Sequence, residues 1–196
     1  MNPPFKLKAF KKIGLCLFLK EFFQHPASIG SAVPSSVLLA KTIAAQIPKD
    51  LDGYVVEIGP GTGVITDMLL KSGVPIAQFI AIERSASFYR YLKMRFPDVN
   101  IIHGDATNLA ELIGEKSSHV SVIVSSLPLR SIPFSAAKKI GQTFEKILKP
   151  NGLFIQFTYS WIKRHSSLPK NFKYIYSKKI WFNLPPARID IFTHQK

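Results

Sequence analysis

A glycine-rich turn is the part of this sequence whose residue types and spacing most clearly suit chemistry. Residues 55–63 read V-V-E-I-G-P-G-T-G: a short apolar strand, a carboxylate and three alternating glycines. Glycines let the backbone approach a ligand closely, and the amide groups that open a following helix attract a negatively charged group. Residues 64–71 predict that helix, with Ile65, Met68 and Leu69 on one face. The stretch therefore predicts a nucleotide-type binding site in an open α/β sheet.

The spacing of the glycines narrows the ligand. A dinucleotide site needs G-x-G-x-x-G, whereas Gly63 follows Gly61 by only two residues. The pattern E-x-G-x-G-x-G resembles the first motif of the class I S-adenosylmethionine-dependent methyltransferases, and a glycine turn without a ligand is the alternative. The resemblance implies that the turn holds the methionine part of S-adenosyl-L-methionine, through Glu57, Gly59, Gly61, Thr62 and Gly63.

A second carboxylate stands where a ribose would be bound. The apolar residues 77–82 predict a strand that ends at Glu83, twenty residues after Gly63. A carboxylate at the end of the second strand accepts hydrogen bonds from both hydroxyls of a ribose diol. We favour this role for Glu83 over a solvated surface glutamate, and the resemblance places the adjacent Arg84 in the cofactor site.

A third strand is predicted over residues 99–103, and it leads into Gly104, Asp105 and Ala106. In the class that the glycine motif resembles, the acidic residue at this position meets the adenine amino group, and Ala106 borders the cofactor. Asp105 could also cap the next helix, and the two roles are compatible.

Two serines complete the predicted cofactor site. Residues 34–47 predict a helix that Ser35 or Ser36 can cap, and Ser36 is equally a candidate for cofactor contact. Ser125 ends a fourth strand, predicted over residues 120–124, and the resemblance makes it a cofactor contact too.

The loop over residues 125–130 is expected to face the reacting group, because ligands in open α/β sheets bind at the carboxyl ends of the strands. Strands and helices alternate along the chain, which predicts one mostly parallel sheet. The remaining predicted elements are helices over residues 86–96 and 134–148, a strand over 152–159, and a closing antiparallel pair over 174–182 and 188–192.

Several further fragments resemble the bacterial phospholipid N-methyltransferases, which convert phosphatidylethanolamine towards phosphatidylcholine and are related to the rRNA adenine dimethyltransferases. The resemblance implies a Rossmann-like α/β fold, with a mostly parallel seven-stranded sheet, helices on both faces and a closing antiparallel strand. It also implies methyl transfer from S-adenosyl-L-methionine to a lipid amine, leaving S-adenosyl-L-homocysteine. The matching fragments are residues 26–40, 56–66, 82–85, 104–106, 126–129, 156–159 and 183–188.

The resemblance assigns the acceptor side of the reaction to the loop that begins at Ser126. Ser126, Leu127 and Pro128 are the predicted catalytic residues of this loop, where a backbone carbonyl would accept a hydrogen bond from the neutral substrate amine. The family usually has glycine at the position of Ser126, so this chain adds a hydroxyl there. The departure puts the loop geometry in question and leaves the class of reaction unchanged.

Three further residues are candidates for holding the lipid. A quaternary amine product is a cation that an aromatic face attracts, and Tyr159, at the end of the fifth strand, is the first candidate for that role. Trp181 is the second, and core packing is the alternative for both. Arg188 could pair with the lipid phosphate or serve the end of the sheet structurally.

The residue at position 129 separates a lipid acceptor from an adenine acceptor. Enzymes that methylate adenine place an aromatic side chain after the proline of this loop to stack on the extruded base, and here the residue is Leu129. The rRNA enzymes also carry a C-terminal RNA domain, which a chain ending at Lys196 is not expected to have. An rRNA adenine methyltransferase and a non-catalytic cofactor-binding protein are therefore the less favoured alternatives.

Composition agrees with an anionic partner. The 196 residues carry 26 Lys plus Arg against 12 Asp plus Glu, a net charge of +14, which suits an anionic membrane surface or nucleic acid. A single cysteine, Cys16, indicates a reducing compartment, and the five histidines show no metal-ligand spacing. We expect a monomer in the cytoplasm, peripherally associated with the inner face of the membrane, with nucleic acid a less favoured partner and no metal.

The first residues are expected to form a separate element. Residues 1–25 predict a basic amphipathic helix that either lies in a membrane interface or packs on the domain. No apolar run approaches the length of a spanning helix, and no secretion signal is recognised. Residues 26–196 are the predicted methyltransferase domain.

Overall fold

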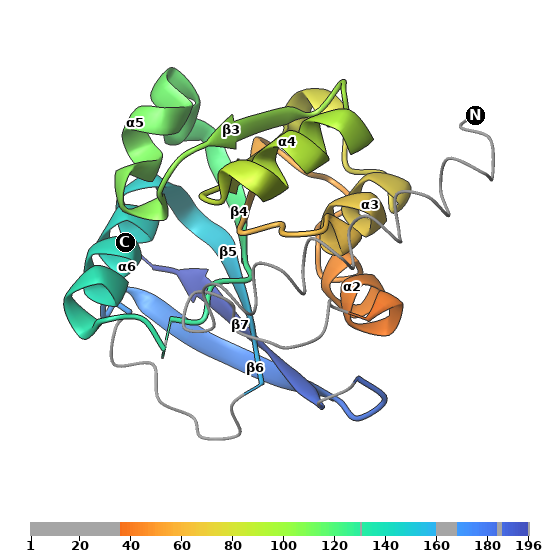
Figure 1. Cartoon of the computed structure of the whole chain (residues 1–196). Helices are drawn as coiled ribbons and strands as arrows, with labels where there is room; N and C mark the ends of the chain where they lie inside the picture. Colours follow the sequence, from red (N-terminus) through yellow and green to blue (C-terminus); the bar gives the residue numbers. More distant parts are fainter. Residues whose placement is uncertain (1–35, 130, 160–167, 184–185, 196) are drawn as a thin grey trace.

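A seven-stranded sheet with helices on both faces forms the described part of the chain, in a computed structural model (Figure 1). The structure describes residues 36–129, 131–159, 168–183 and 186–195. The strand order is β3-β2-β1-β4-β5-β7-β6, and only β7 runs antiparallel to its neighbours. The expected Rossmann-like α/β fold, with a mostly parallel seven-stranded sheet, helices on both faces and a closing antiparallel strand, is confirmed.

The elements follow the order that the sequence predicts, with changed ends. The strands are β1 (Tyr54–Ile58), β2 (Phe79–Glu83), β3 (Asn100–His103), β4 (Val120–Ser125), β5 (Leu148–Thr158), β6 (Phe172–Ile180) and β7 (Ala187–His194). The α-helices are α2 (Val37–Ala44), α3 (Val64–Lys71), α4 (Ala86–Arg95), α5 (Leu109–Ile113) and α6 (Phe134–Ile147). Short 3-10 turns lie at Ile76–Gln78, Ala106–Asn108 and Gly114–His119.

The two faces of the sheet bury separate apolar clusters. Alternate strand residues such as Val55 and Val124 pack with α2, α3 and α4 on one face, while Val56 and Ile123 pack with α5 and α6 on the other. Figure 1 shows α2 and α3 on the opposite side of the sheet from α5 and α6. Since both faces are covered, the central strands carry apolar residues toward both faces, as parallel strands in α/β proteins do.

Strand ends in the last part of the sheet differ from the prediction. β5 begins at Leu148 rather than at residue 152, because the segment before Gly152 already pairs with β4 across a register shift. β6 is displaced by two residues and ends at Ile180, whose partner Ala187 is the first residue of β7. Trp181 and Phe182, which follow Ile180, pair with no strand among the described residues, although their apolar character is typical of a strand.

The predicted N-terminal helix over residues 1–25 lies outside the described residues, so its role stays a prediction. Within the described ranges, no helix has the length and apolar character needed to cross a bilayer.

Candidate active site

The strand order reverses between β1 and β4, and the glycine turn and the acceptor loop meet at that point. The Ser126 amide donates to the Ile58 carbonyl at 2.9 Å, which carries the pairing of β4 with β1 past the strand ends. A Cβ built on Gly59 would lie 3.3 Å from the Leu127 side chain. The turn after β1 and the loop after β4 are therefore in contact, at the crevice where open α/β sheets bind ligands.

Left-handed backbone at Gly59, Gly61 and Gly63 gives the turn its shape, with φ of 71°, 57° and 74°. Gly63 is packed from below: a Cβ there would lie 2.6 Å from the Phe96 ring and 2.8 Å from Leu92. Gly61 has open space above it, since a Cβ there would meet nothing within 4 Å among the described residues. The turn thus presents a backbone cradle with room for a ligand over Gly61.

Alanine substitutions should separate these two glycines. Gly63→Ala combines a strained φ with a clash and should lower the free energy of unfolding by about 2–4 kcal/mol. Gly61→Ala carries the strain alone, about 1 kcal/mol, but it fills the cradle and should weaken binding of the predicted cofactor. Chemical denaturation and ligand titration measure the two effects. Equal destabilisation by the two variants would contradict the packing described.

Glu83 closes the cradle from the neighbouring strand. Its carboxylate is buried at the end of β2, where Oε2 accepts from the Gly61 amide at 3.0 Å and Oε1 accepts from the Ser85 amide at 2.8 Å. Each carboxylate oxygen has a second lone pair, so the group can still accept from two ligand hydroxyls. The structure brings Glu83 to the glycine turn, as the ribose role requires, and excludes the solvated alternative.

Asp105 lies beyond the end of β3, on the far side of Glu83 from the turn. Its Oδ1 accepts from the Thr107 amide at 2.9 Å, which confirms the expected cap, and the exposed Arg84 lies 3.5 Å from Oδ2. Partial burial acts to raise the pKa of Asp105, but the Thr107 hydrogen bonds and the Arg84 charge outweigh it and lower the pKa below its usual value. Ala106 is buried beside it, so a charged acceptor and a small apolar side chain border this end of the crevice.

Glu57 is a buried carboxyl directly below the turn. Its Oε2 accepts from the Thr66 hydroxyl at 2.6 Å, whereas Oε1 has no hydrogen-bond partner among the described residues. Burial, with a smaller contribution from the charge of Glu83, raises the pKa of Glu57 to about 8. Oε1 is therefore available to a ligand group, and a cationic group beside it would lower the pKa of Glu57 again.

Four buried polar atoms without partners among the described residues gather at this edge of the sheet. They lie within three residues of the row in which Ile58, Ser125 and Gln156 pair. Buried polar groups are almost always hydrogen-bonded, so a cluster of exceptions indicates a site that a ligand completes. The atoms are Glu57 Oε1, Ser126 Oγ, Gln156 Oε1 and Tyr159 Oη.

In the acceptor loop, which follows β4, hydrogen bonds to the backbone carbonyls of Leu127 and Pro128 fix the conformation. The Leu127 carbonyl accepts from Leu129 N at 2.9 Å and from Gln156 Nε2 at 3.0 Å. The Pro128 carbonyl accepts from the amides of Ser131 at 2.7 Å and Ile132 at 3.3 Å. Both lone pairs of each carbonyl are thus engaged. The Ser126 hydroxyl, which has no partner within the described ranges, is a better acceptor for a ligand N–H than either carbonyl.

Gln156 is a site residue that sequence reasoning missed. Its amide donates to the Leu127 carbonyl and to the Phe157 carbonyl, so it joins β5 to the acceptor loop. The residue stood in a fragment used for family resemblance, but its side chain was given no role. A buried amide at the carboxyl end of a central strand was the available signal.

The two aromatic candidates are in different surroundings. Tyr159 follows β5 and packs edge-to-face on Phe157, with ring centroids 5.8 Å apart. Trp181 follows β6 and is 61% exposed, so its core-packing alternative is wrong. Ser125 is buried, and its hydroxyl accepts from the Leu127 amide at 3.3 Å, which shapes the loop.

Arg188 and Ser36 take structural roles that the sequence left open. Arg188 is buried and pairs through two nitrogens with Asp190, at 2.8 and 2.7 Å, so its charge is compensated within β7. The pair with Asp190 explains why an arginine is buried here without any need for a lipid phosphate. The phosphate role stays an unsupported prediction. Ser36 caps α2 by accepting from the Leu39 amide, and its own amide donates to Asn183 Oδ1 at 3.1 Å. Its cofactor contact also stays a prediction.

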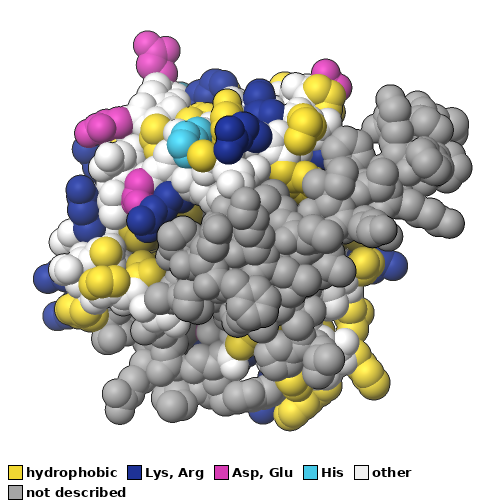
Figure 2. All heavy atoms as spheres, viewed as in Figure 1, with side chains coloured by type: hydrophobic (Ala, Val, Ile, Leu, Met, Phe, Trp, Pro, Cys, Tyr) yellow, Lys and Arg dark blue, Asp and Glu magenta, His cyan; other side chains and the backbone are white. Residues whose placement is uncertain are grey.

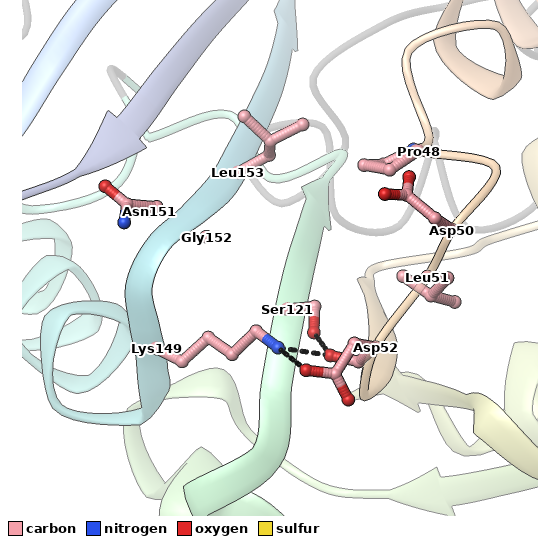
Figure 3. A pocket seen from close by; sticks show the side chains of 9 residues that line it. All are labelled: Pro48, Asp50, Leu51, Asp52, Ser121, Lys149, Asn151, Gly152 and Leu153. Carbon is pink, nitrogen blue, oxygen red and sulfur yellow. Dashed lines mark hydrogen bonds and ion pairs between the residues drawn. The ribbon is translucent and has the colours of Figure 1, made fainter.

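A pocket of about 210 Å³ lies at the opposite edge of the sheet, near the starts of β4 and β5 (Figure 3). Lys149 spans it to pair with Asp52 at 2.8 Å, and this hydrogen bond lowers the pKa of Asp52. None of the predicted site residues lines the pocket. The Lys149–Asp52 pair links the segment before β1 to β5. The pocket is therefore not the candidate active site.

Known proteins are similar to this chain in sequence and in fold. Residues 55–152 match the family described as methyltransferase domains. The chain is 33% identical over 146 residues to the ornithine lipid N-methyltransferase of Singulisphaera acidiphila, a match that covers 72% of this chain and 76% of that protein. It is 31% identical over 126 residues to the ribosomal RNA small subunit methyltransferase A of Dehalococcoides mccartyi, covering 62% of this chain and 40% of that protein.

The fold is similar to that of a solved bacterial enzyme, the N-methyltransferase NodS from Bradyrhizobium japonicum in complex with S-adenosyl-L-homocysteine. The TM-score is 0.62 at 11% identity, and the match covers 82% of this chain and 84% of that one. At this identity the similarity shows the fold alone.

Proposed function

Because this chain belongs to the methyltransferase-domain family, we propose that it is a lipid N-methyltransferase that acts on the amine of phosphatidylethanolamine at a membrane surface. The chain is an S-adenosyl-L-methionine-dependent methyltransferase. The similarity to an ornithine lipid N-methyltransferase supports a lipid amine as acceptor. The observation that carries the proposal is the row of unsatisfied polar atoms at the carboxyl ends of β1, β4 and β5, beside the glycine turn.

The residues at the glycine turn fit the cofactor. The open cradle over Gly61 can receive its amino-acid part, and Glu57 Oε1 suits a positive charge. Glu83 has acceptor capacity for a ribose diol, and Asp105 for an adenine amino group. When bound, S-adenosyl-L-methionine would supply a methyl group on a sulfonium; attack of an amine lone pair on that methyl carbon would break the carbon–sulfur bond in line and release S-adenosyl-L-homocysteine.

On the acceptor side, the residues would bind and orient a neutral primary amine. The Ser126 hydroxyl can accept an N–H from the amine, a role that the loop carbonyls of Leu127 and Pro128 no longer offer. The Tyr159 ring offers a face for the cation that forms as the amine is methylated. Holding the amine in near-attack geometry is the main source of acceleration in such a reaction.

Leu129 argues for a lipid rather than adenine. Its side chain packs with Leu127 and Ile132 on the α6-side core, so the position that an adenine enzyme gives to a stacking aromatic supplies core packing instead. An extruded base would lose a stacking contact worth about 1–3 kcal/mol.

Substitutions at Tyr159 test the cation site. Tyr159→Leu removes the aromatic face and should lower kcat for methyl transfer by about tenfold, the scale of a partly desolvated cation–π contact. Tyr159→Phe keeps the face and should retain most of the activity. It also removes a buried hydroxyl without a partner in the described structure, so the free energy of unfolding should rise by up to about 1 kcal/mol. A loss of activity as large in Tyr159→Phe as in Tyr159→Leu would refute the aromatic role.

Methyl transfer from labelled S-adenosyl-L-methionine tests the proposed function directly. Vesicles containing phosphatidylethanolamine should become labelled, and mono- and dimethylated phosphatidylethanolamine show how many methyl groups are added. Vesicles with an ornithine lipid and an rRNA fragment serve as parallel acceptors. Labelling of the ornithine lipid alone would show that the acceptor is an ornithine lipid and not phosphatidylethanolamine. Labelling of adenine in the RNA would overturn the lipid proposal.

A further inference from the structure

An exposed apolar surface lies at the end of β6, next to the start of α2. Four apolar side chains form it: Phe182 is 92% exposed, Trp181 61%, Val37 54% and Leu38 45%. The Ser36 amide donates to Asn183 Oδ1, which joins the two segments although 147 residues separate them in sequence. We refer to Val37, Leu38, Trp181 and Phe182 as the apolar tip. Figure 2 shows hydrophobic side chains at the lower right of the molecule, where α2 and the end of β6 lie in Figure 1.

The apolar tip lies at the same edge of the sheet as the candidate active site. β7 runs antiparallel to both β5 and β6, so β5 and β6 point in the same direction. Register places Thr158, Arg188 and Lys179 in one row, and Trp181 and Phe182 extend beyond that row. Tyr159 also follows Thr158 beyond the row. A flat surface such as a bilayer that contacts the tip would therefore also face the edge of the sheet where the methyl acceptor must enter.

Basic residues surround the tip, and acidic ones are absent from the neighbouring sequence. Residues 36–49 and 168–189 contain no Asp or Glu. The Nζ atoms of Lys178 and Lys179 lie over the rings of Tyr176 and Trp181, at 5.8 and 5.6 Å from the ring centroids. Lys41 is exposed on α2, one turn after Val37. An apolar centre with a lysine border matches the acyl and headgroup layers of an anionic bilayer.

We propose that the apolar tip inserts into the headgroup boundary of an anionic lipid bilayer and presents the lipid amine to the candidate active site. The proposal rests on the lipid substrate proposed above. An exposed group of neighbouring apolar side chains, such as the four of the tip, marks a surface that a protein or membrane partner covers. RNA is the less suitable partner: Trp181 and Phe182 could stack on bases, but the aliphatic Val37 and Leu38, which complete the tip, cannot.

Vesicle binding by the full chain tests the proposal, with Leu38→Gln/Phe182→Gln as the variant. Partitioning into vesicles of phosphatidylglycerol and phosphatidylcholine should fall by about tenfold or more. The matched control is Ile76→Gln/Met94→Gln, which replaces two side chains that are 48% and 64% exposed near the amino ends of β2 and β3. The control should bind vesicles as the unsubstituted protein does, and both variants should keep its melting temperature.

The two tryptophans of the chain allow a depth measurement. Trp161→Phe leaves Trp181 as the only indole, so its emission should shift to the blue on vesicles and be quenched by brominated acyl chains. An unshifted, unquenched emission, or vesicle binding unchanged in Leu38→Gln/Phe182→Gln, would overturn the proposal. Loss of binding to single-stranded RNA, with vesicle binding intact, would also overturn it in favour of a nucleic-acid surface.

Acceptor lipid in detergent micelles distinguishes this proposal from the proposed function. Leu38→Gln/Phe182→Gln should methylate micellar phosphatidylethanolamine at the rate of the unsubstituted protein but lose activity on vesicles. Equal loss in micelles and on vesicles would overturn the docking role. A protein that binds vesicles through the tip yet methylates no lipid would refute the proposed function and support the docking surface.

Discussion

Replacing Glu83 with glutamine is expected to lower the affinity for S-adenosyl-L-methionine by about 3 kcal/mol, a factor of roughly 100 or more. The carboxylate accepts from the Gly61 and Ser85 amides and has acceptor capacity left for both ribose hydroxyls. The amide nitrogen of glutamine accepts no hydrogen bond, so it would face the N–H and O–H donors on its side of the group without bonding to them. Isothermal titration calorimetry of the purified variant measures the loss.

A control and a second ligand make the result specific to the ribose. Glu111→Gln makes the same chemical change on the exposed side of α5 and should leave the affinity unchanged. S-adenosyl-L-homocysteine should bind the unsubstituted protein more tightly than its 2′-deoxy analogue does, and Glu83→Gln should lose most of that preference. Retention of the preference in the variant would assign the ribose to another residue.

The stability of the cofactor-free protein should fall as pH rises, because of Glu57. Its pKa is raised to about 8 by burial, against 4.5 for an ordinary glutamate, so the folded state binds a proton more tightly than the unfolded chain. The free energy of unfolding therefore decreases from about pH 4.5 to about pH 8 and is flat above that, by an amount on the order of a few kcal/mol. Urea denaturation at a series of pH values measures the slope.

Glu57→Gln separates this carboxyl from the other titrating groups. The neutral amide fits the same site and can accept from the Thr66 hydroxyl, so the variant should match the unsubstituted protein near pH 5 and be more stable near pH 8. Cofactor binding should release a proton from the unsubstituted protein near pH 7, because a cation beside Oε1 favours the carboxylate, and should release fewer from the variant. Calorimetry in buffers of different ionisation enthalpy counts these protons. Parallel pH profiles of the two proteins would contradict the assignment.

Local sequence was enough to place the candidate cofactor residues at one edge of the sheet, because they follow directly from strand ends. Glu57, the three glycines, Glu83 and Asp105 each stand where an apolar run stops, and carboxyl ends of parallel strands meet at one edge of a sheet. The acceptor half was harder. Gln156 approaches Leu127 from 29 residues away, and only the pairing of β4 with β5 brings them together.

Pattern and composition determined the class of fold, the cofactor type and the excess of positive charge, since these depend on residue type and short spacing. Tertiary structure decided which polar groups have partners. Arg188 is engaged by Asp190, whereas the hydroxyls of Ser126 and Tyr159 have no partners within the described ranges. It also decided that Trp181 and Phe182 leave the sheet, because the last residue of β6, Ile180, pairs with the first residue of β7, Ala187. Hydrogen bonding and exposure are properties of neighbours in space, which spacing along the chain does not specify.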